Sequence, residues 1–83
     1  MKFRAEIDVM PLKSLLDPQG KAVSASMHNV GLGEIENVRI GKHITLELEA
    51  ISEKDAGLKV DEACTKMLCN QIMESFEFTI VKI

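Results

Sequence analysis

Two cysteines and two histidines are the residues of this chain best suited to nucleophilic attack, proton transfer or metal binding. Cys64 and Cys69 stand five positions apart in a segment of helical periodicity, roughly 140° apart around a helix axis. That spacing matches no zinc motif. His28 and His43 have no cysteine or carboxylate at a recognisable ligand or triad spacing. We therefore predict no catalytic residue and no metal site, with both thiols in the core and Cys69 partly exposed.

Carboxylates and glycines offer two further signals, and both are weak. Glu47, Glu49 and Glu77 fall in strand-like segments, where facing carboxylates can exchange protons. Like charges on an open sheet face are more often simply solvated, and we interpret them so. The run Gly31-Leu32-Gly33 follows a helical pattern rather than a strand and lacks a third glycine, so it is interpreted as a turn and not as a dinucleotide site.

Arg39, Gly41 and Lys42 form the one basic cluster that deserves a functional hypothesis. Arg39 falls on the polar side of its strand pattern, and Lys42 on the apolar side, where a long side chain at an edge can reach water. Gly41 interrupts the strand pattern, which indicates a bend or a close backbone approach. The two cations serve either solubility or the recognition of an acidic partner surface, and the residues alone leave both open.

The segments at the two ends of the chain predict strands. Residues 2–10 alternate between apolar and polar side chains, and Pro11, which lacks an N–H group, is expected to end the strand. Residues 75–83 alternate in the same way. The side chains expected to face inward are Phe3, Ala5, Ile7, Val9, Phe76, Phe78 and Ile80.

The segment between residues 38 and 48 alternates longest, with a period of two. Because the alternation continues through Gly41 and Lys42, the segment is either one long bent strand or two strands that meet at Gly41. A Gly-Lys pair is not a typical hairpin turn, which favours one bent strand. The inward side chains are expected to be Val38, Ile40, Ile44, Leu46 and Leu48.

Two helices are predicted between these strands. Asp17 and Pro18 suit the N-cap and first position of a helix that ends before Gly31. Ser52 and Asp55 resemble a capping box for a second helix, whose apolar stripe is Val60, Ala63, Cys64, Met67 and Leu68. The order β-α-β-α-β predicts one α+β domain over residues 1–83, with an antiparallel sheet and both helices packed on one face.

Composition bounds the class of protein. The chain has 83 residues, of which 46% are hydrophobic, and a net charge of −3. An acidic balance argues against a general nucleic-acid binder, and no apolar run is long enough for a membrane helix. Two cysteines without a disulfide framework suggest a reducing cytoplasm. A small core with so much aliphatic surface favours a homo-oligomer, most simply a dimer.

Three runs together resemble the PurS family, the small subunit of phosphoribosylformylglycinamidine (FGAM) synthase. The resemblance covers nearly the whole chain. The runs are Leu16-Asp17-Pro18-Gln19-Gly20-Lys21-Ala22-Val23, Val38-Arg39-Ile40-Gly41-Lys42 and Cys64-Thr65-Lys66-Met67-Leu68-Cys69-Asn70. The matching motif positions are Asp17, Pro18, Gly20, Arg39, Gly41, Lys42, Leu68 and Asn70, with Glu74 at an acidic position before the last strand. Where the family usually has Leu-Leu-Ala-Asn-Pro, this chain has Met67-Leu68-Cys69-Asn70-Gln71.

The resemblance implies a non-catalytic subunit of purine biosynthesis. Such chains, as dimers or tetramers, bridge a glutaminase subunit (PurQ) and a large synthetase subunit (PurL) and assist ammonia transfer. ATP and magnesium would bind the synthetase, and this chain would hold no cofactor. The alternative is a ferredoxin-like regulatory module in which Gly31-Leu32-Gly33 and Arg39 contact a small molecule.

Overall fold

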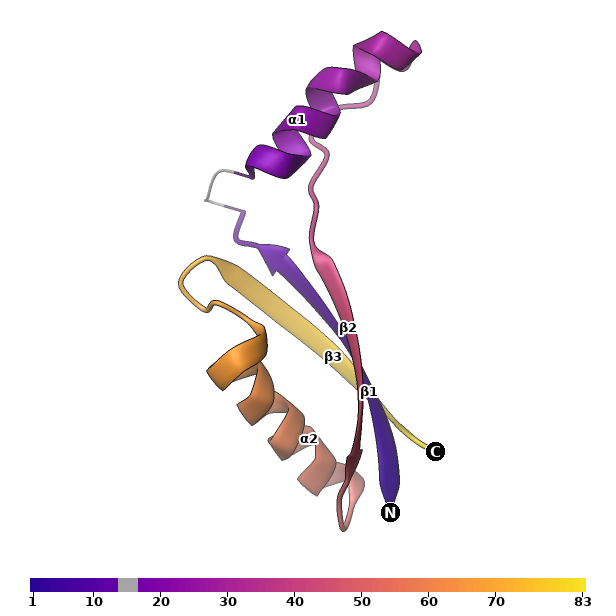
Figure 1. Ribbon diagram of the computed structural model, residues 1–83, viewed down its shortest axis with the longest axis vertical. Coiled ribbons are helices and arrows are strands. Elements are labelled where there is room, and N and C mark those ends of the chain that lie inside the picture. Colours follow the sequence, from indigo (N-terminus) through magenta and orange to yellow (C-terminus); the bar gives the residue numbers. More distant parts are fainter. Residues whose placement is uncertain (14–16) are drawn as a thin grey trace.

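A three-stranded antiparallel sheet and two helical segments make up the fold. The computed structural model describes residues 1–13 and 17–83, and Leu16, the first residue of the first PurS-like run, lies outside them. The sheet order is β2-β1-β3. The elements are β1 (Lys2–Pro11), α1 (Pro18–Ser26), the 3₁₀ helix η1 (Met27–Val30), β2 (Lys42–Glu49), α2 (Glu53–Ala63), the π-helix η2 (Cys64–Leu68) and β3 (Glu74–Lys82). The predicted α+β class and antiparallel sheet are confirmed (Figure 1).

The core lies between the central strand β1 and helix α2. The four inward residues predicted for β1 are buried. Three of them pack with Val60 of α2 and Cys64 of η2, and Phe3 packs with Ala50 and Ala56. The inward residues of the two edge strands are half-buried around this centre, as their alternation predicted: Ile44, Leu46, Leu48, Phe76, Phe78 and Ile80. Period-two alternation therefore identified the buried face of all three strands.

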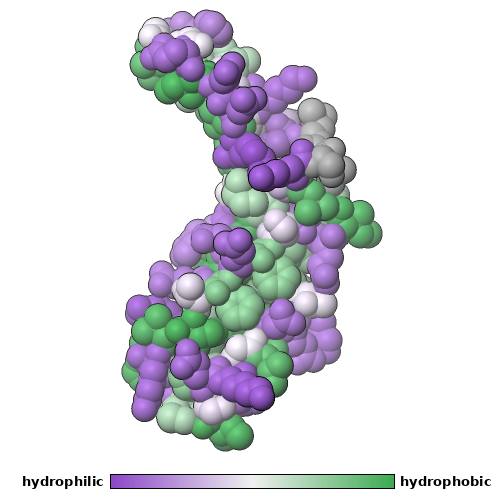
Figure 2. Space-filling view, turned by 180° about the vertical axis from the view of Figure 1, so that it is seen from behind, coloured by the Kyte–Doolittle hydropathy of each residue, from purple (hydrophilic) through white to green (hydrophobic). Residues whose placement is uncertain are grey.

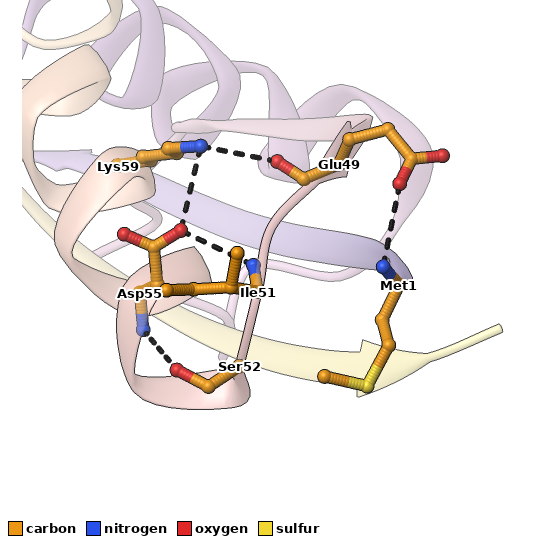
Figure 3. A network of polar contacts seen from close by, with 6 residues as sticks. All are labelled: Met1, Glu49, Ile51, Ser52, Asp55 and Lys59. Carbon is orange, nitrogen blue, oxygen red and sulfur yellow. Dashed lines mark hydrogen bonds and ion pairs between the residues drawn. The ribbon is translucent and has the colours of Figure 1, made fainter.

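Helix α2 begins at the predicted capping residue. The Ser52 hydroxyl accepts a hydrogen bond from the Asp55 backbone N–H at 3.1 Å, and the Asp55 carboxylate accepts from the Ile51 N–H at 3.4 Å. Lys59, one turn later, reaches both the Asp55 carboxylate at 3.4 Å and the Glu49 carbonyl at 3.2 Å (Figure 3). These contacts join the end of β2 to the first turn of α2, which fixes the helix on the sheet.

The last turn of this helical segment corrects two predictions. Cys69 is buried rather than partly exposed, and Met67, which was expected on the apolar stripe, is 84% exposed. The Cys69 N–H donates to the Cys64 carbonyl, a five-residue step. A π turn rotates each residue less about the axis than an α turn does, so Leu68 instead of Met67 follows Cys64 onto the buried side.

Helix α1 corrects the prediction that both helices cover one face of the sheet. Only α2 lies on the sheet, while α1 and η1 project beyond its end (Figure 1). We call residues 18–35 the arm. Within α1 only Gly20 is buried, and no arm residue belongs to the described core clusters. An apolar stripe predicts that one face of a helix is buried, but it does not predict which surface buries that face.

Strand β2 is shorter than its sequence pattern predicted. It begins at Lys42, and residues 38–41 run from the sheet toward α1 without pairing. The Val38 N–H donates to the Ser24 hydroxyl at 2.9 Å, and the Ile40 N–H donates to the Asp17 carboxylate at 3.0 Å. Because these backbone donors bind side chains of the helical segment, the long bent strand was a wrong expectation, and the change of structure falls at Gly41.

Candidate functional site

Most of the motif residues named above meet where the arm joins the sheet, a region we call the neck. The neck consists of Pro11, Asp17–Gly20, Val38–Lys42 and Glu74. A shallow cleft of about 340 Å³ opens there, lined by Pro11, Asp17, Pro18, Gln19, Ile40, Gly41, Lys42 and Glu74. Four separate segments of the chain supply this lining, so only the folded structure brings the residues together.

Asp17 is the polar centre of the neck. Its Oδ1 accepts a hydrogen bond from the Gly20 N–H at 2.9 Å, which is the predicted N-cap contact. Its Oδ2 accepts from the Ile40 N–H at 3.0 Å. The hydrogen bonds from Gly20 and then Ile40 lower the pKa of this carboxyl, and the charge of Arg39 adds to the effect. One carboxylate therefore caps helix α1 and connects it to the unpaired segment, residues 38–41, that returns from the arm.

Gly20 and Gly41 are both required by close contacts. A Cβ atom on Gly20 would overlap the Val38 carbonyl oxygen, and one on Gly41 would overlap the Val9 carbonyl oxygen and the Met10 sulfur. The close approach predicted at Gly41 is therefore present. Both glycines let two segments of the neck pack with backbone against backbone.

Arg39 and Lys42 also make contacts within the chain. A terminal nitrogen of the Arg39 guanidinium donates to the Pro11 carbonyl at the end of β1. The Lys42 Nζ lies 3.8 Å from the Glu74 carboxylate, and both residues line the cleft. As the sequence suggested, Lys42 occupies the apolar side at a strand end and reaches outward, with about half of its side chain exposed.

The turn before β3 completes this side of the neck. Glu74 Oε1 accepts a hydrogen bond from the Asn70 N–H at 2.9 Å. The Asn70 carbonyl accepts from the Met73 and Glu74 N–H groups, and its side-chain oxygen accepts from the Ile72 N–H. These bonds hold the turn between η2 and β3. Leu68, the last motif residue, is half-buried against the core.

Neither cysteine is placed to act as a nucleophile. Burial raises the pKa of the Cys64 thiol, and burial likewise raises the pKa of Cys69. A higher thiol pKa leaves less thiolate at neutral pH. The interpretation of both residues as core thiols fits this environment.

A polar cluster on the outer face of the sheet escaped the sequence analysis. His43 Nδ1 lies 2.6 Å from the Asp8 carboxylate, and its Nε2 lies 3.8 Å from Glu6. The hydrogen bond to Asp8 raises the pKa of His43. The strand register explains the omission, because Asp8 pairs with both His43 and Glu77 across the sheet, although these residues are distant in sequence.

Two further carboxylates of this face, Glu47 and Glu49, make ion pairs. Glu47 lies 3.3 Å from the Lys2 ammonium, and Glu49 lies 3.5 Å from the N-terminal amine (Figure 3). Among residues 1–13 and 17–83, no group of three metal-ligating side chains has a geometry that would hold an ion. No helix in the same ranges is long and apolar enough to cross a lipid bilayer.

The residues of the alternative small-molecule site do not come together. Gly31, with φ of 80°, ends η1 in the arm, and Gly33 lies close to the His28 ring. Arg39 instead belongs to the neck, where it contacts Pro11. The separation leaves the ferredoxin-like regulatory hypothesis without a common ligand site.

Comparison with known proteins confirms the family resemblance that the three sequence runs indicated. The model of the PurS family, described as phosphoribosylformylglycinamidine (FGAM) synthase, matches residues 4–82. The chain is a small α+β domain with a β2-β1-β3 sheet. It belongs to the PurS family. PurS of Bacillus subtilis is 33% identical over 98% of this chain and 95% of its own length. PurS of Synechocystis is 37% identical over 94% of this chain and 78% of its own length.

Solved structures share the fold as well as the sequence. The B. subtilis PurS structure has a TM-score of 0.86 at 34% identity and covers 96% of this chain and 99% of its own. A chain in the structure of PurLQS from Thermotoga maritima has a TM-score of 0.88 at 28% identity, with 98% of this chain and 99% of that chain covered. The projecting arm therefore belongs to an arrangement that matches over nearly the full length.

Proposed function

We propose that this chain is the PurS subunit of an FGAM synthase, acting in purine biosynthesis with PurL and PurQ subunits. The match over nearly its full length to a chain of the T. maritima PurLQS structure carries the proposal. The ATP and magnesium of the reaction would bind to the synthetase subunit. This chain would act in the reducing cytoplasm, where free thiols persist.

The chemistry of the described residues supports a non-catalytic role. Glutamine hydrolysis by a cysteine glutaminase needs an activated thiolate, and both thiols here have raised pKa values. ATP use needs a phosphate-binding loop and carboxylates that hold a metal. What the chain offers is a folded surface that can hold other subunits together.

The bridging surface is proposed to include Arg39, Gly41 and Lys42. The cleft beside them is lined by Ile40, Gly41 and Lys42 and by the carboxylates Asp17 and Glu74. Their internal contacts orient both cations, so the neck presents a fixed charge pattern to an acidic partner surface.

Ammonia at neutral pH is mostly protonated and is lost to water, so a sealed route between two catalytic subunits would preserve it.

Reconstitution of the three subunits tests the bridging role. Omission of this chain should abolish glutamine-dependent synthesis while it spares much of the synthesis driven by a high concentration of ammonium. Full coupling of the two catalytic subunits without it would contradict the proposal.

Charge reversal then tests the neck itself. Arg39→Glu with Lys42→Glu should reproduce the omission, whereas Lys54→Glu with Lys82→Glu changes the net charge equally and should retain coupling. Because Arg39 also holds the Pro11 carbonyl, circular dichroism must show that the variants stay folded. Arg39→Gln keeps a donor for that carbonyl and removes the charge, and it should lower coupling partially. Equal loss in the two charge-reversed pairs would place the bridging surface elsewhere.

A further inference from the structure

Cys64 and Cys69 are nucleophilic groups that the proposed function leaves unused. Both are free thiols, and both belong to the same core cluster, in which Cys64 has no exposed surface and Cys69 is 7% exposed. Figure 2 shows hydrophobic side chains at the surface of the arm and below the neck, but the two thiols are buried beneath the surface. Two thiols in one cluster can react with each other if their spacing allows a bond.

The π turn of η2 brings the two cysteines to the same side of the helical segment. On an α-helix, residues five positions apart point about 140° away from each other. Here the Cys69 N–H donates to the Cys64 carbonyl at 3.0 Å, which closes a five-residue turn. Across such a turn the fifth residue returns to the face of the first, as the fourth residue does on an α-helix. The local change of helical pitch therefore pairs two thiols that an α-helix would separate.

The spacing across one turn suits a disulfide bond. The Cα atoms of bonded cysteines lie about 4.4–6.8 Å apart, and residues on adjacent turns of one helix face have Cβ atoms about 5–6 Å apart. The charge of Cys69 is, after burial, the next cause that raises the pKa of Cys64, which agrees with their proximity. Cys69 already has extended backbone, with φ of −134° and ψ of 134°. A small adjustment at this residue therefore leaves helix α2 intact.

We propose that Cys64 and Cys69 form a redox-sensitive pair, which a small disulfide such as oxidised glutathione converts into an intramolecular disulfide bond. The more exposed Cys69 reacts first: its thiolate attacks one sulfur of the reagent, forms a mixed disulfide and releases one reduced glutathione. The Cys64 thiolate then attacks the Cys69 sulfur and releases the second. The two thiols are oxidised, the reagent is reduced, and the two protons that the thiols lose are taken up by the leaving glutathione thiolates.

The buried position sets the conditions under which the pair reacts. Burial raises the pKa of Cys64 and of Cys69, so neither is an active nucleophile at rest, and in a reducing compartment both remain thiols. Exchange needs a transient opening of η2, a single turn at the end of α2. Local openings of this kind require less free energy than global unfolding. The pair therefore responds slowly to sustained oxidation and does not turn over like a catalytic thiol.

The bond would restrain the turn that leads into the neck. Asn70 directly follows Cys69, and its N–H donates to the carboxylate of Glu74, which pairs with Lys42. A disulfide closes residues 64–69 into a covalent loop and so removes the opening motion of η2. This inference goes beyond the bridging role and does not rest on it, because both thiols belong to one chain.

Oxidation of the isolated wild-type chain by oxidised glutathione tests the pair. Both thiols should be lost together, and trypsin, which cleaves after Lys66 between the cysteines, should leave two peptides joined by the new bond. The ratio of internal to mixed disulfide should be higher in the folded chain than in the urea-unfolded chain by about tenfold or more, because the turn holds the thiols close. A folded chain that keeps both thiols, forms only mixed or intermolecular disulfides, or shows no excess over the unfolded chain would overturn the proposal.

Single variants test the order of the two steps. Cys64→Ala should stop at the mixed disulfide on Cys69, whereas Cys69→Ala should leave the fully buried Cys64 unmodified over the same time. Reaction of Cys64 in Cys69→Ala at the rate of the wild type would contradict this order. The wild-type measurement does not depend on the folding of either variant.

Hydrogen exchange tests the effect on the turn. In the oxidised wild-type chain the Asn70 N–H should exchange more slowly than in the reduced chain, while the exchange of β1 stays unchanged. Equal exchange at Asn70 in the two forms would contradict the restraint on the turn. Because these measurements use the isolated chain, their failure would be distinguishable from failure of the bridging role, which is measured with all three subunits.

Discussion

The sheet layer and the arm of this chain are held in different ways. In the sheet layer, apolar side chains of β1 and α2 are fully buried, and the strands pair along their length. In the arm, a short helix keeps its position because the Asp17 carboxylate and the Ser24 hydroxyl accept backbone hydrogen bonds. Close backbone packing at Gly20 and Gly41 adds to these contacts. The first region is stabilised by burial of its own side chains, whereas the second is positioned by the hydrogen bonds of the neck. Within 83 residues, one region therefore supplies the stable core, and the other supplies a surface that projects from it.

A core truncation should give the largest difference between the two regions. Ile7 is fully buried in the centre of the sheet, so Ile7→Ala should lower the free energy of unfolding by about 2–5 kcal/mol. Val30→Ala removes an exposed side chain of the arm and should change it by less than about 0.5 kcal/mol when the chain is dilute enough to be monomeric. Urea denaturation measures both. Similar losses would show that the arm contributes to the core after all.

Substitutions at two glycines should have smaller and opposite effects on stability. Gly41→Ala places a methyl group against the Val9 carbonyl and the Met10 sulfur, and it should cost about 1–3 kcal/mol of stability. Gly57→Ala lies in helix α2 with no atom near the new methyl group, and it should stabilise the chain by about 0.5–1 kcal/mol. Thermal denaturation of both variants provides the test. Two changes in stability of the same sign would show that the close contacts of Gly41 do not limit its side chain.

The sheet layer could be predicted from the sequence far better than the arm. Alternation identifies the inward side chains of a strand whatever its partners are, which is why Ala5, Ile7 and Phe78 were correctly assigned. The cap residues Asp17 and Ser52 were also identified, because a helix N-terminus needs an acceptor within three residues.

Three features depended on information that periodicity does not contain. The N–H groups of Val38 and Ile40 are taken by side chains of the helical segment, so a strand-like pattern did not become a strand. The π turn moved Met67 outward by changing the rotation per residue. His43 met Asp8 only through the register between β1 and β2. In each case a contact distant in sequence, or a local change in helical pitch, decided the outcome.

Asp17 variants should affect the arm more than the sheet. Asp17→Ala removes both the cap of α1 and the acceptor for the Ile40 N–H, and we expect the melting temperature to fall by about 5 °C. Asp17→Asn keeps one acceptor oxygen and should fall less. Hydrogen exchange should rise in residues 18–30 and at Ile40 while the exchange of β1 stays slow. Uniform loss of protection across both regions would mean that the neck is part of the folding core.

The smallest expected effect belongs to the outer face of the sheet, where His43 bridges β2 and β1. The hydrogen bond to Asp8, followed by the charges of Asp8 and Glu6, raises the pKa of His43 above its ordinary value of 6.5. Because the folded-state pKa is the higher one, the stabilising contribution is fully present below pH 6.5 and is lost as the pH rises through the folded-state pKa.

Nuclear magnetic resonance titration of the histidine ring measures this directly. Asp8→Asn should lower the pKa of His43 more than Glu6→Gln does, since Asp8 makes the 2.6 Å contact and Glu6 lies at 3.8 Å. The stability difference between wild type and Asp8→Asn should also shrink as the pH is raised from 6 to 8. Half of the His43 side chain is exposed, so solvent screens the pair and the difference should be small. A pKa that does not move in Asp8→Asn would show that the contact between His43 and Asp8 is not kept in solution.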